Sequence, residues 1–113
     1  MMLEDINPLI TEYKSIHIGD MVTTYHKGYF EVLGFAHYGN NPTGAIQCIY
    51  RRVADSGGQP CGGKPKSCHA DYVKKIDHKS LKDDNEYEDE NLRLKYCALH
   101  KILRKLEAAQ WLI

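Results

Sequence analysis

The sequence predicts an α+β fold, in which a strongly bent antiparallel sheet packs against a long C-terminal helix and follows a short N-terminal helix. Three observations support this prediction. Strand-forming segments follow one another between residues 19 and 76, turn-forming segments separate them, and an amphipathic helix ends the chain. A run of strands followed by a helix is typical of α+β proteins. At 113 residues the chain has room for one modest core, so residues 1–113 are predicted to form a single domain.

Residues 7–15 predict the short N-terminal helix. Asn7 can cap a helix, and Pro8 suits the first helical position because the N–H of that position needs no partner within the helix. The apolar side chains of the segment fall on one side of the predicted helix: Leu9, Ile10 and Tyr13.

Four segments rich in β-branched and aromatic residues predict the strands. They span residues 20–25, 29–38, 45–53 and 69–76. Lys27-Gly28 marks a tight turn between the first two strands, and Gly34 predicts a bulge or a sharp bend within the second. The glycine-rich segment 55–67 predicts a mobile loop, and we expect it to contact a partner because loops this long in a small domain are usually functional.

Residues 84–112 predict the long C-terminal helix, with Asp83 and Glu86 resembling a capping box at its start. Side chains at 4-3 spacing keep one narrow stripe facing a partner, as in a coiled-coil helix: Leu92, Tyr96, Leu99, Leu103, Leu106, Gln110 and Ile113. We predict that the first six residues of this stripe, from Leu92 to Gln110, form the interface of a homodimer or higher oligomer. The alternative is that the stripe covers the open side of the chain's own sheet.

Two segments of the strand region are similar to the opening hairpin of a known family. They are Gly19-Asp20-Met21-Val22 and Gly28-Tyr29-Phe30-Glu31-Val32-Leu33-Gly34-Phe35. On these residues the chain resembles SH3-like small barrels of the Tudor and KOW type over residues 19–76. The resemblance implies that this region is a β-barrel, and that the protein is a binding module for peptides or nucleic acid and not an enzyme.

Aromatic and basic residues of the strand region are the predicted partner-binding residues. The set is Tyr25, Tyr29, Phe35, Tyr38, Tyr50, Arg51, Arg52, Lys64 and Lys66. Bases interleaved with aromatic rings hold phosphates and stack on nucleobases, and tyrosine also suits protein interfaces. The alternative is that most rings pack in the core while the lysines keep strand edges soluble. Strand alternation places Arg52 on the inner side, where it pairs with an acid or lines a cleft near Tyr50, and places Arg51 outside.

Four residues offer the ligand types of a zinc site: Cys61, Cys68, Cys97 and His100. Only Cys97 and His100 are closely spaced, and free thiols are the better interpretation of the set, so we expect no metal and no cofactor. Cys68 and His69 are neighbours on a predicted strand, where their side chains point to opposite faces. They therefore do not predict a nucleophile and its base, and no catalytic residue is predicted.

Charge and hydropathy limit the function classes. The formal net charge is zero, but bases concentrate in residues 51–82 and acids in residues 83–90. No apolar run approaches the roughly 18 residues that span a bilayer, and the first residues lack the pattern of a signal peptide. We therefore expect a cytoplasmic protein that does not enter membranes and whose cysteines are reduced.

These observations predict a small non-catalytic binding protein that recognises or sequesters a macromolecular partner or an anionic ligand, with a protein as the first expectation. The size and mixture of features are also those of accessory inhibitor proteins from viruses and mobile elements. Two alternatives stay open. One is a module that binds nucleic acid or nucleotides through the basic 51–75 surface, and the other is a small zinc-binding or cysteine-dependent enzyme.

Overall fold

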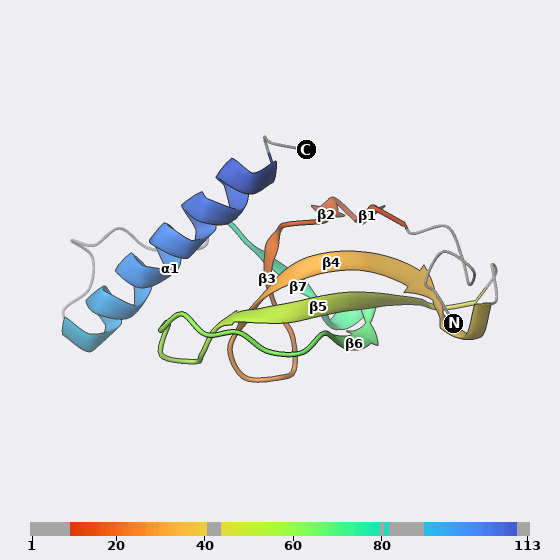
Figure 1. The fold of residues 1–113 in the computed structure, drawn as a ribbon, viewed down its shortest axis with the longest axis horizontal. Coiled ribbons are helices and arrows are strands. Elements are labelled where there is room, and N and C mark those ends of the chain that lie inside the picture. Colours follow the sequence, from red (N-terminus) through yellow and green to blue (C-terminus); the bar gives the residue numbers. More distant parts are fainter. Residues whose placement is uncertain (1–9, 41–43, 80, 82–89, 111–113) are drawn as a thin grey trace.

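A computed structural model describes residues 10–40, 44–79, 81 and 90–110 of the chain. In these residues a five-stranded antiparallel sheet and a two-stranded hairpin precede the C-terminal helix (Figure 1). The helix lies at one end of the sheet, and the turn at Tyr38–Asn40 that follows residues 29–37 lies at the other. The predicted α+β class is thus confirmed.

The large sheet has the strand order β6-β5-β4-β3-β7, and every neighbouring pair is antiparallel. Its strands are β3 (Met21–Thr23), β4 (Tyr29–His37), β5 (Ile46–Ala54), β6 (Lys66–His69) and β7 (Lys74–Ile76). The last strand in sequence therefore returns to pair with the first strand of the sheet. The β4–β5 ladder shifts register between Tyr29 and Phe30 and again between Val32 and Gly34. The bulge predicted at Gly34 is confirmed, and such bulges increase the twist and bend of a sheet.

The predicted strand at residues 69–76 is wrong as a single element, because it consists of the end of β6, a 3-10 turn η3 (Ala70–Tyr72) and β7. The Asp71 N–H donates to His69 Nδ1 at 3.2 Å, and the Val73 N–H donates to the Ala70 carbonyl at 3.2 Å. These local bonds satisfy backbone groups that would otherwise need a neighbouring strand. The turn takes the chain from one edge of the sheet to the other.

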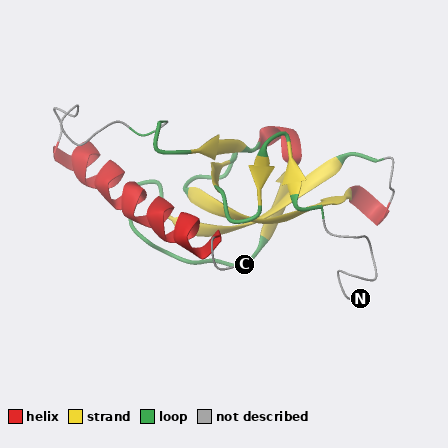
Figure 2. Ribbon diagram, turned by 90° about the horizontal axis from the view of Figure 1, so that it is seen from above, coloured by secondary structure: helices red, strands yellow, loops and turns green. Residues whose placement is uncertain are grey.

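The sheet does not close into the predicted barrel within the described residues. β6 and β7 are its two outer strands, and no pairing joins them. They are four and three residues long, and η3 separates them directly, so neither extends far enough to form a ladder with the other. The sheet is therefore bent but open (Figure 2).

The predicted helix at residues 7–15 is wrong where the structure describes it, while residues 7–9 lie outside the described part. Ile10 forms an antiparallel bridge with Phe35, with N–H to carbonyl distances of 3.0 and 2.9 Å. β1 (Glu12–Tyr13) and β2 (Ile16–His17) then form a hairpin around a left-handed turn. Pairing with β4 and the hairpin satisfies the backbone better than a short, marginal helix would.

Two apolar clusters lie on the two faces of the sheet. The cluster that we call the inner core contains Ile16, Val22, Phe30, Val32, Phe35, Cys48, Tyr50, Cys68, Ala70 and Val73. The cluster that we call the helix core contains Met21, Ala54, Leu81, Leu99, Ile102 and Leu103. Adjacent residues of a strand face opposite sides, so Met21 and Val22 of β3 belong to different cores.

The helix α1 (Glu90–Gln110) packs its stripe against its own sheet. Leu99 and Leu103 are buried, Tyr96 and Leu106 are partly buried, and Leu92 is 43% exposed. The predicted dimer stays a prediction, and a dimer through Leu99 and Leu103 would require α1 to leave the sheet. The rest of the predicted helix, residues 84–89 and 111–112, lies outside the described part, as does Ile113. Within the described residues, no helix is long and apolar enough to cross a membrane.

Candidate binding site at an exposed tyrosine cluster

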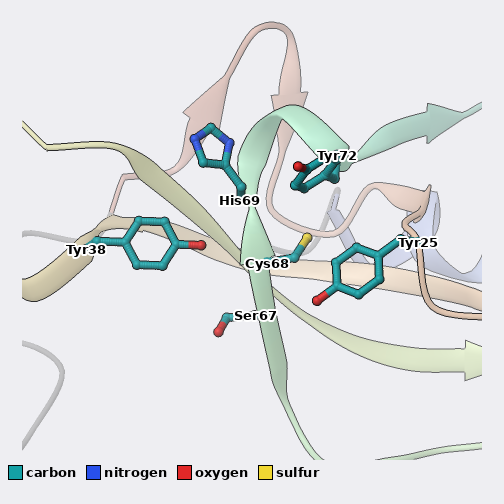
Figure 3. Close-up of a pocket in the computed structure, with 6 residues that line it drawn as sticks. All are labelled: Tyr25, Tyr38, Ser67, Cys68, His69 and Tyr72. Atoms are coloured by element: carbon teal, nitrogen blue, oxygen red, sulfur yellow. The ribbon is translucent and has the colours of Figure 1, made fainter.

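Three exposed tyrosines gather around one open concavity of about 630 Å³ (Figure 3). We call its lining the tyrosine cluster, which consists of Tyr25, Tyr38, Ser67, Cys68, His69 and Tyr72. Exposed fractions are 65% for Tyr25, 62% for Tyr72 and 40% for Tyr38. Large apolar rings this exposed are unusual enough, when they are grouped, to mark an interaction surface.

Four different elements supply the cluster. Tyr25 lies in the loop between β3 and β4, and Tyr38 begins the 3-10 turn η2 (Tyr38–Asn40) that follows β4. The edge strand β6 supplies three lining residues, and η3 supplies Tyr72. In Figure 3, Tyr25 and Tyr38 lie on opposite sides of β6. The turn at η3 is what places Tyr72 beside Tyr25, although the two residues are far apart in the sequence.

The rings meet mostly at steep angles. The Tyr25 and Tyr72 ring centroids are 5.9 Å apart with their planes at 80°, and those of His69 and Tyr72 are 6.0 Å apart at 73°. Tyr38 and His69 are 6.3 Å apart with planes at 35°. Edge-to-face contacts of this kind are favourable, so they help to hold the rings in this arrangement.

The hairpin β1–β2 fixes the position of η3 through Asp71. The Asp71 carboxylate accepts a hydrogen bond from the Tyr13 hydroxyl at 2.7 Å and one from Lys14 Nζ at 3.1 Å. These two contacts, Tyr13 first, hold the pKa of Asp71 below its ordinary value. The Asp71 carboxylate, which lies next to the cluster along the chain, is therefore already hydrogen-bonded. In the part of the chain that the structure describes, no acidic residue lines the concavity.

The Cys68 thiol, which is buried beneath the cluster, is expected to be unreactive. Cys68 lies directly opposite Cys48 in the β5–β6 ladder, and both cysteines are buried and free. Burial raises the pKa of the Cys68 thiol, and burial raises that of Cys48 to about 12. Both groups are therefore protonated at neutral pH, and a protonated thiol is a poor nucleophile.

The structure brings only two of the predicted aromatic residues to this site. Tyr25 and Tyr38 line the cluster, whereas Phe35 and Tyr50 are fully buried in the inner core. Tyr29 packs on the helix core, where Lys95 Nζ lies 5.5 Å from its ring centroid. The alternative of core packing thus holds for these three rings.

The predicted basic residues lie elsewhere and are partly engaged. Arg51 forms an ion pair with Glu31 on the outer side of the sheet, as its predicted orientation requires. Arg52 donates a hydrogen bond to the Lys27 carbonyl at 2.9 Å, and its guanidinium lies over the Phe30 ring. These two contacts are neither the predicted pairing with an acid nor the predicted contact with Tyr50. With the 60–63 loop, both arginines line a separate shallow concavity. Lys64 and Lys66 are exposed.

The four candidate zinc ligands do not come together. Cys61 is exposed in the 55–65 loop, Cys68 lies in the inner core, and Cys97 and His100 are on α1. Among the described residues, no group of three or more histidine, cysteine or acidic side chains could hold a metal ion. His100 instead contacts His78.

Sequence reasoning missed Ser67, His69 and Tyr72. His69 and Tyr72 fall where one continuous strand was predicted, and Ser67 falls in the predicted 55–67 loop. Neither prediction gives a sign that these residues share a surface with Tyr25. The chain matches no protein-family model, and neither a search of curated proteins nor a search of solved structures found a match.

Proposed function

We propose that this protein is a non-catalytic binding module that holds an extended segment of a protein partner against the tyrosine cluster. The observation that carries the proposal is the gathering of three exposed tyrosines from separate elements around one concavity. Tyrosine gives a large contact area at a small cost in side-chain entropy, and it is enriched at the centres of protein interfaces. Burial raises the pKa of the Cys68 thiol, and a protonated thiol is a poor nucleophile, which supports a binding role over a cysteine-dependent enzyme.

The chemistry of the lining favours an extended, proline-containing segment. Proline rings pack well on open aromatic faces, and a polyproline helix is already ordered before it binds. The hydroxyl groups at the rim, including those of Tyr25, Tyr38 and Ser67, can donate to the backbone carbonyls that such a segment leaves free. A cationic ligand is less favoured because, among the described residues, no acidic side chain lines the concavity.

The SH3-like assignment belongs to the same proposal. Two features support it: the last strand, β7, returns to pair with β3, and the 3-10 turn η3 directly precedes β7. The open edge between β6 and β7 is a departure from a closed barrel. The assignment concerns the arrangement of strands, and the binding proposal is argued from the cluster itself.

Selection from a displayed library of random peptides tests the proposal. We expect enrichment of proline-containing peptides, and we expect Tyr72→Ala to weaken their binding by about tenfold or more, as at interface hot spots. Leu94→Ala is the matched control, because Leu94 is a similarly exposed apolar residue on α1. Circular dichroism should show that both variants stay folded.

Two results would overturn this proposal. One is a set of enriched peptides that binds the Tyr72→Ala variant as tightly as the parent protein. The other is the absence of any enriched peptide together with salt-sensitive binding of nucleic acid that Tyr25→Ala leaves unchanged, because the basic 51–75 surface would then be the functional one.

A further inference from the structure

Two histidines meet where the chain beyond β7 contacts α1. His78 Nδ1 lies 3.0 Å from His100 Nδ1, and His78 Nε2 lies 2.9 Å from a carboxylate oxygen of Glu107. His100 and Glu107 are two turns apart on α1. Leu81, three residues after His78, is buried in the helix core. The contact therefore joins the segment after β7 to the helix at a point beside the apolar packing.

The geometry is that of two imidazoles sharing one proton. The ring centroids are 5.3 Å apart and the planes differ by 8°. The centroid separation equals the distance between the two Nδ1 atoms plus the radius of each ring, so the two centroids and the two Nδ1 atoms lie on one line. Because the planes are also nearly parallel, the rings are nearly coplanar and meet nitrogen to nitrogen. Two nitrogens that ligate one metal ion would instead point toward a common third position. A linear N–H···N hydrogen bond fits these distances.

The head-to-head contact accepts one positive charge but not two. When His78 carries both ring protons, it donates from Nε2 to Glu107 and from Nδ1 to a neutral His100. When both rings are protonated, two N–H groups face each other, the hydrogen bond is lost, and two cations lie side by side. The doubly protonated pair therefore fits separated rings better than rings that meet head to head.

Charged groups of the described residues also lie near the pair. Glu107 is the acid in contact with His78, and Asp77 and Lys79 flank that residue in the chain. Within about one turn of His100, α1 carries Cys97, Lys101 and Arg104. The bases add to the repulsion that a second positive charge meets, while Glu107 stabilises the first.

We propose that His78 and His100 form a pH-sensitive clasp that strengthens the attachment of α1 to the sheet near neutral pH and weakens it when both imidazoles are protonated. The detached state of α1 binds more protons, so acidification favours it. Histidine changes charge between about pH 5 and 8, which sets the pH window of this weakening. Detachment exposes Leu99, Ile102 and Leu103, the side chains that the sheet otherwise covers. This inference is independent of the proposed peptide binding.

Hydrogen exchange of the α1 amides, corrected for the intrinsic effect of pH, tests the clasp. Between neutral pH and about pH 5, we expect protection of α1 to fall roughly tenfold, the loss expected for one hydrogen bond to a charged group. His100→Asn should abolish this pH dependence, because asparagine places an acceptor near the position of Nδ1 but cannot take up a proton. His37→Asn, at the far end of β4 from α1, is the matched control and should behave as the parent protein (Figure 1).

A second variant keeps the test decisive if His100→Asn does not fold. Glu107→Gln removes the charge that favours the first proton, so the loss of α1 protection should begin at a higher pH than in the parent protein. The proposal is overturned if protection of α1 in the parent protein does not change with pH. It is equally overturned if His100→Asn folds and shows the same acid-induced loss as the parent, or if Glu107→Gln leaves the onset of that loss unchanged.

Discussion

The two faces of the sheet are stabilised in different ways. The inner core is made of strand and turn residues, and its members are apolar apart from the Tyr50 hydroxyl and the two thiols. The helix core is smaller, and polar contacts surround it. At the end of α1, Gln110 Nε2 donates to the Ile18 carbonyl at 3.0 Å and to Asp20 Oδ1 at 3.1 Å.

This difference separates a rigid platform from an adjustable attachment. The tyrosine cluster rests on the inner core, which is held mainly by apolar packing between strand and turn residues. The helix is held by a short apolar stripe together with the histidine pair and the Asp20 contacts, and polar contacts respond to pH and to single substitutions. We therefore expect mutations on the two faces to differ in size and in pH dependence.

The largest effect is expected in the inner core. Phe35→Ala removes a fully buried ring from beneath the hairpin, and we expect the free energy of unfolding to fall by about 3–5 kcal/mol. That is a large part of the total stability of a small domain. Urea denaturation followed by circular dichroism measures the change. A loss below about 1 kcal/mol would contradict the view of this core as the rigid face.

A smaller loss is expected in the helix core. Leu103→Ala removes a buried side chain and should cost about 2–5 kcal/mol, whereas Leu92→Ala, at an exposed position of the same stripe, should change stability by about 0.5 kcal/mol or less. Paired denaturation curves measure the difference. Equal effects of the two variants would mean that the stripe packs on a second copy and not on the sheet, and light scattering would then show the oligomer.

The hydrogen bonds of Gln110 at the end of α1 should contribute less to the free energy of unfolding than the helix core does. Gln110→Ala leaves Asp20, which is 9% exposed, without one of its hydrogen bonds, although Lys75 Nζ remains 3.3 Å from the carboxylate. We expect a loss of about 1–2 kcal/mol, with exchange of the last α1 amides rising first. Lys105→Ala, on the exposed side of the same helix, serves as the control and should have no measurable effect.

The smallest effect concerns Asp71, whose contacts are exposed. Its pKa in the folded protein is lowered from 3.8, first by the Tyr13 hydroxyl and then by Lys14. The stabilisation is therefore present above the ordinary carboxyl pKa and is lost as the pH falls through the lowered value. Thermal unfolding should show a slightly smaller drop in melting temperature on acidification for Asp71→Asn than for the parent protein. An identical acid dependence would show that these contacts do not stabilise η3.

Individual elements show which parts of the fold can be predicted from the sequence. The composition and alternation of residues 29–38 and 45–53 predicted β4 and β5 nearly to their ends, and Gly34 predicted the bulge. The helix predicted at residues 7–15 is wrong where the structure describes it, because Ile10 pairs with β4 although the segment has local helix features. Local propensity decides a structure only where no distant strand offers better hydrogen bonds.

The sequence by itself determined the class of fold, the central strands and the apolar stripe of α1, because these follow from periodicity and from composition within single segments. The tertiary structure alone decided what the stripe covers, which rings are buried and which are exposed, and where the histidines meet. Tyr25 and Tyr72, or His78 and His100, become neighbours only through turns and docking between distant segments. No spacing along the chain encodes such contacts, since they depend on the packing of the whole domain.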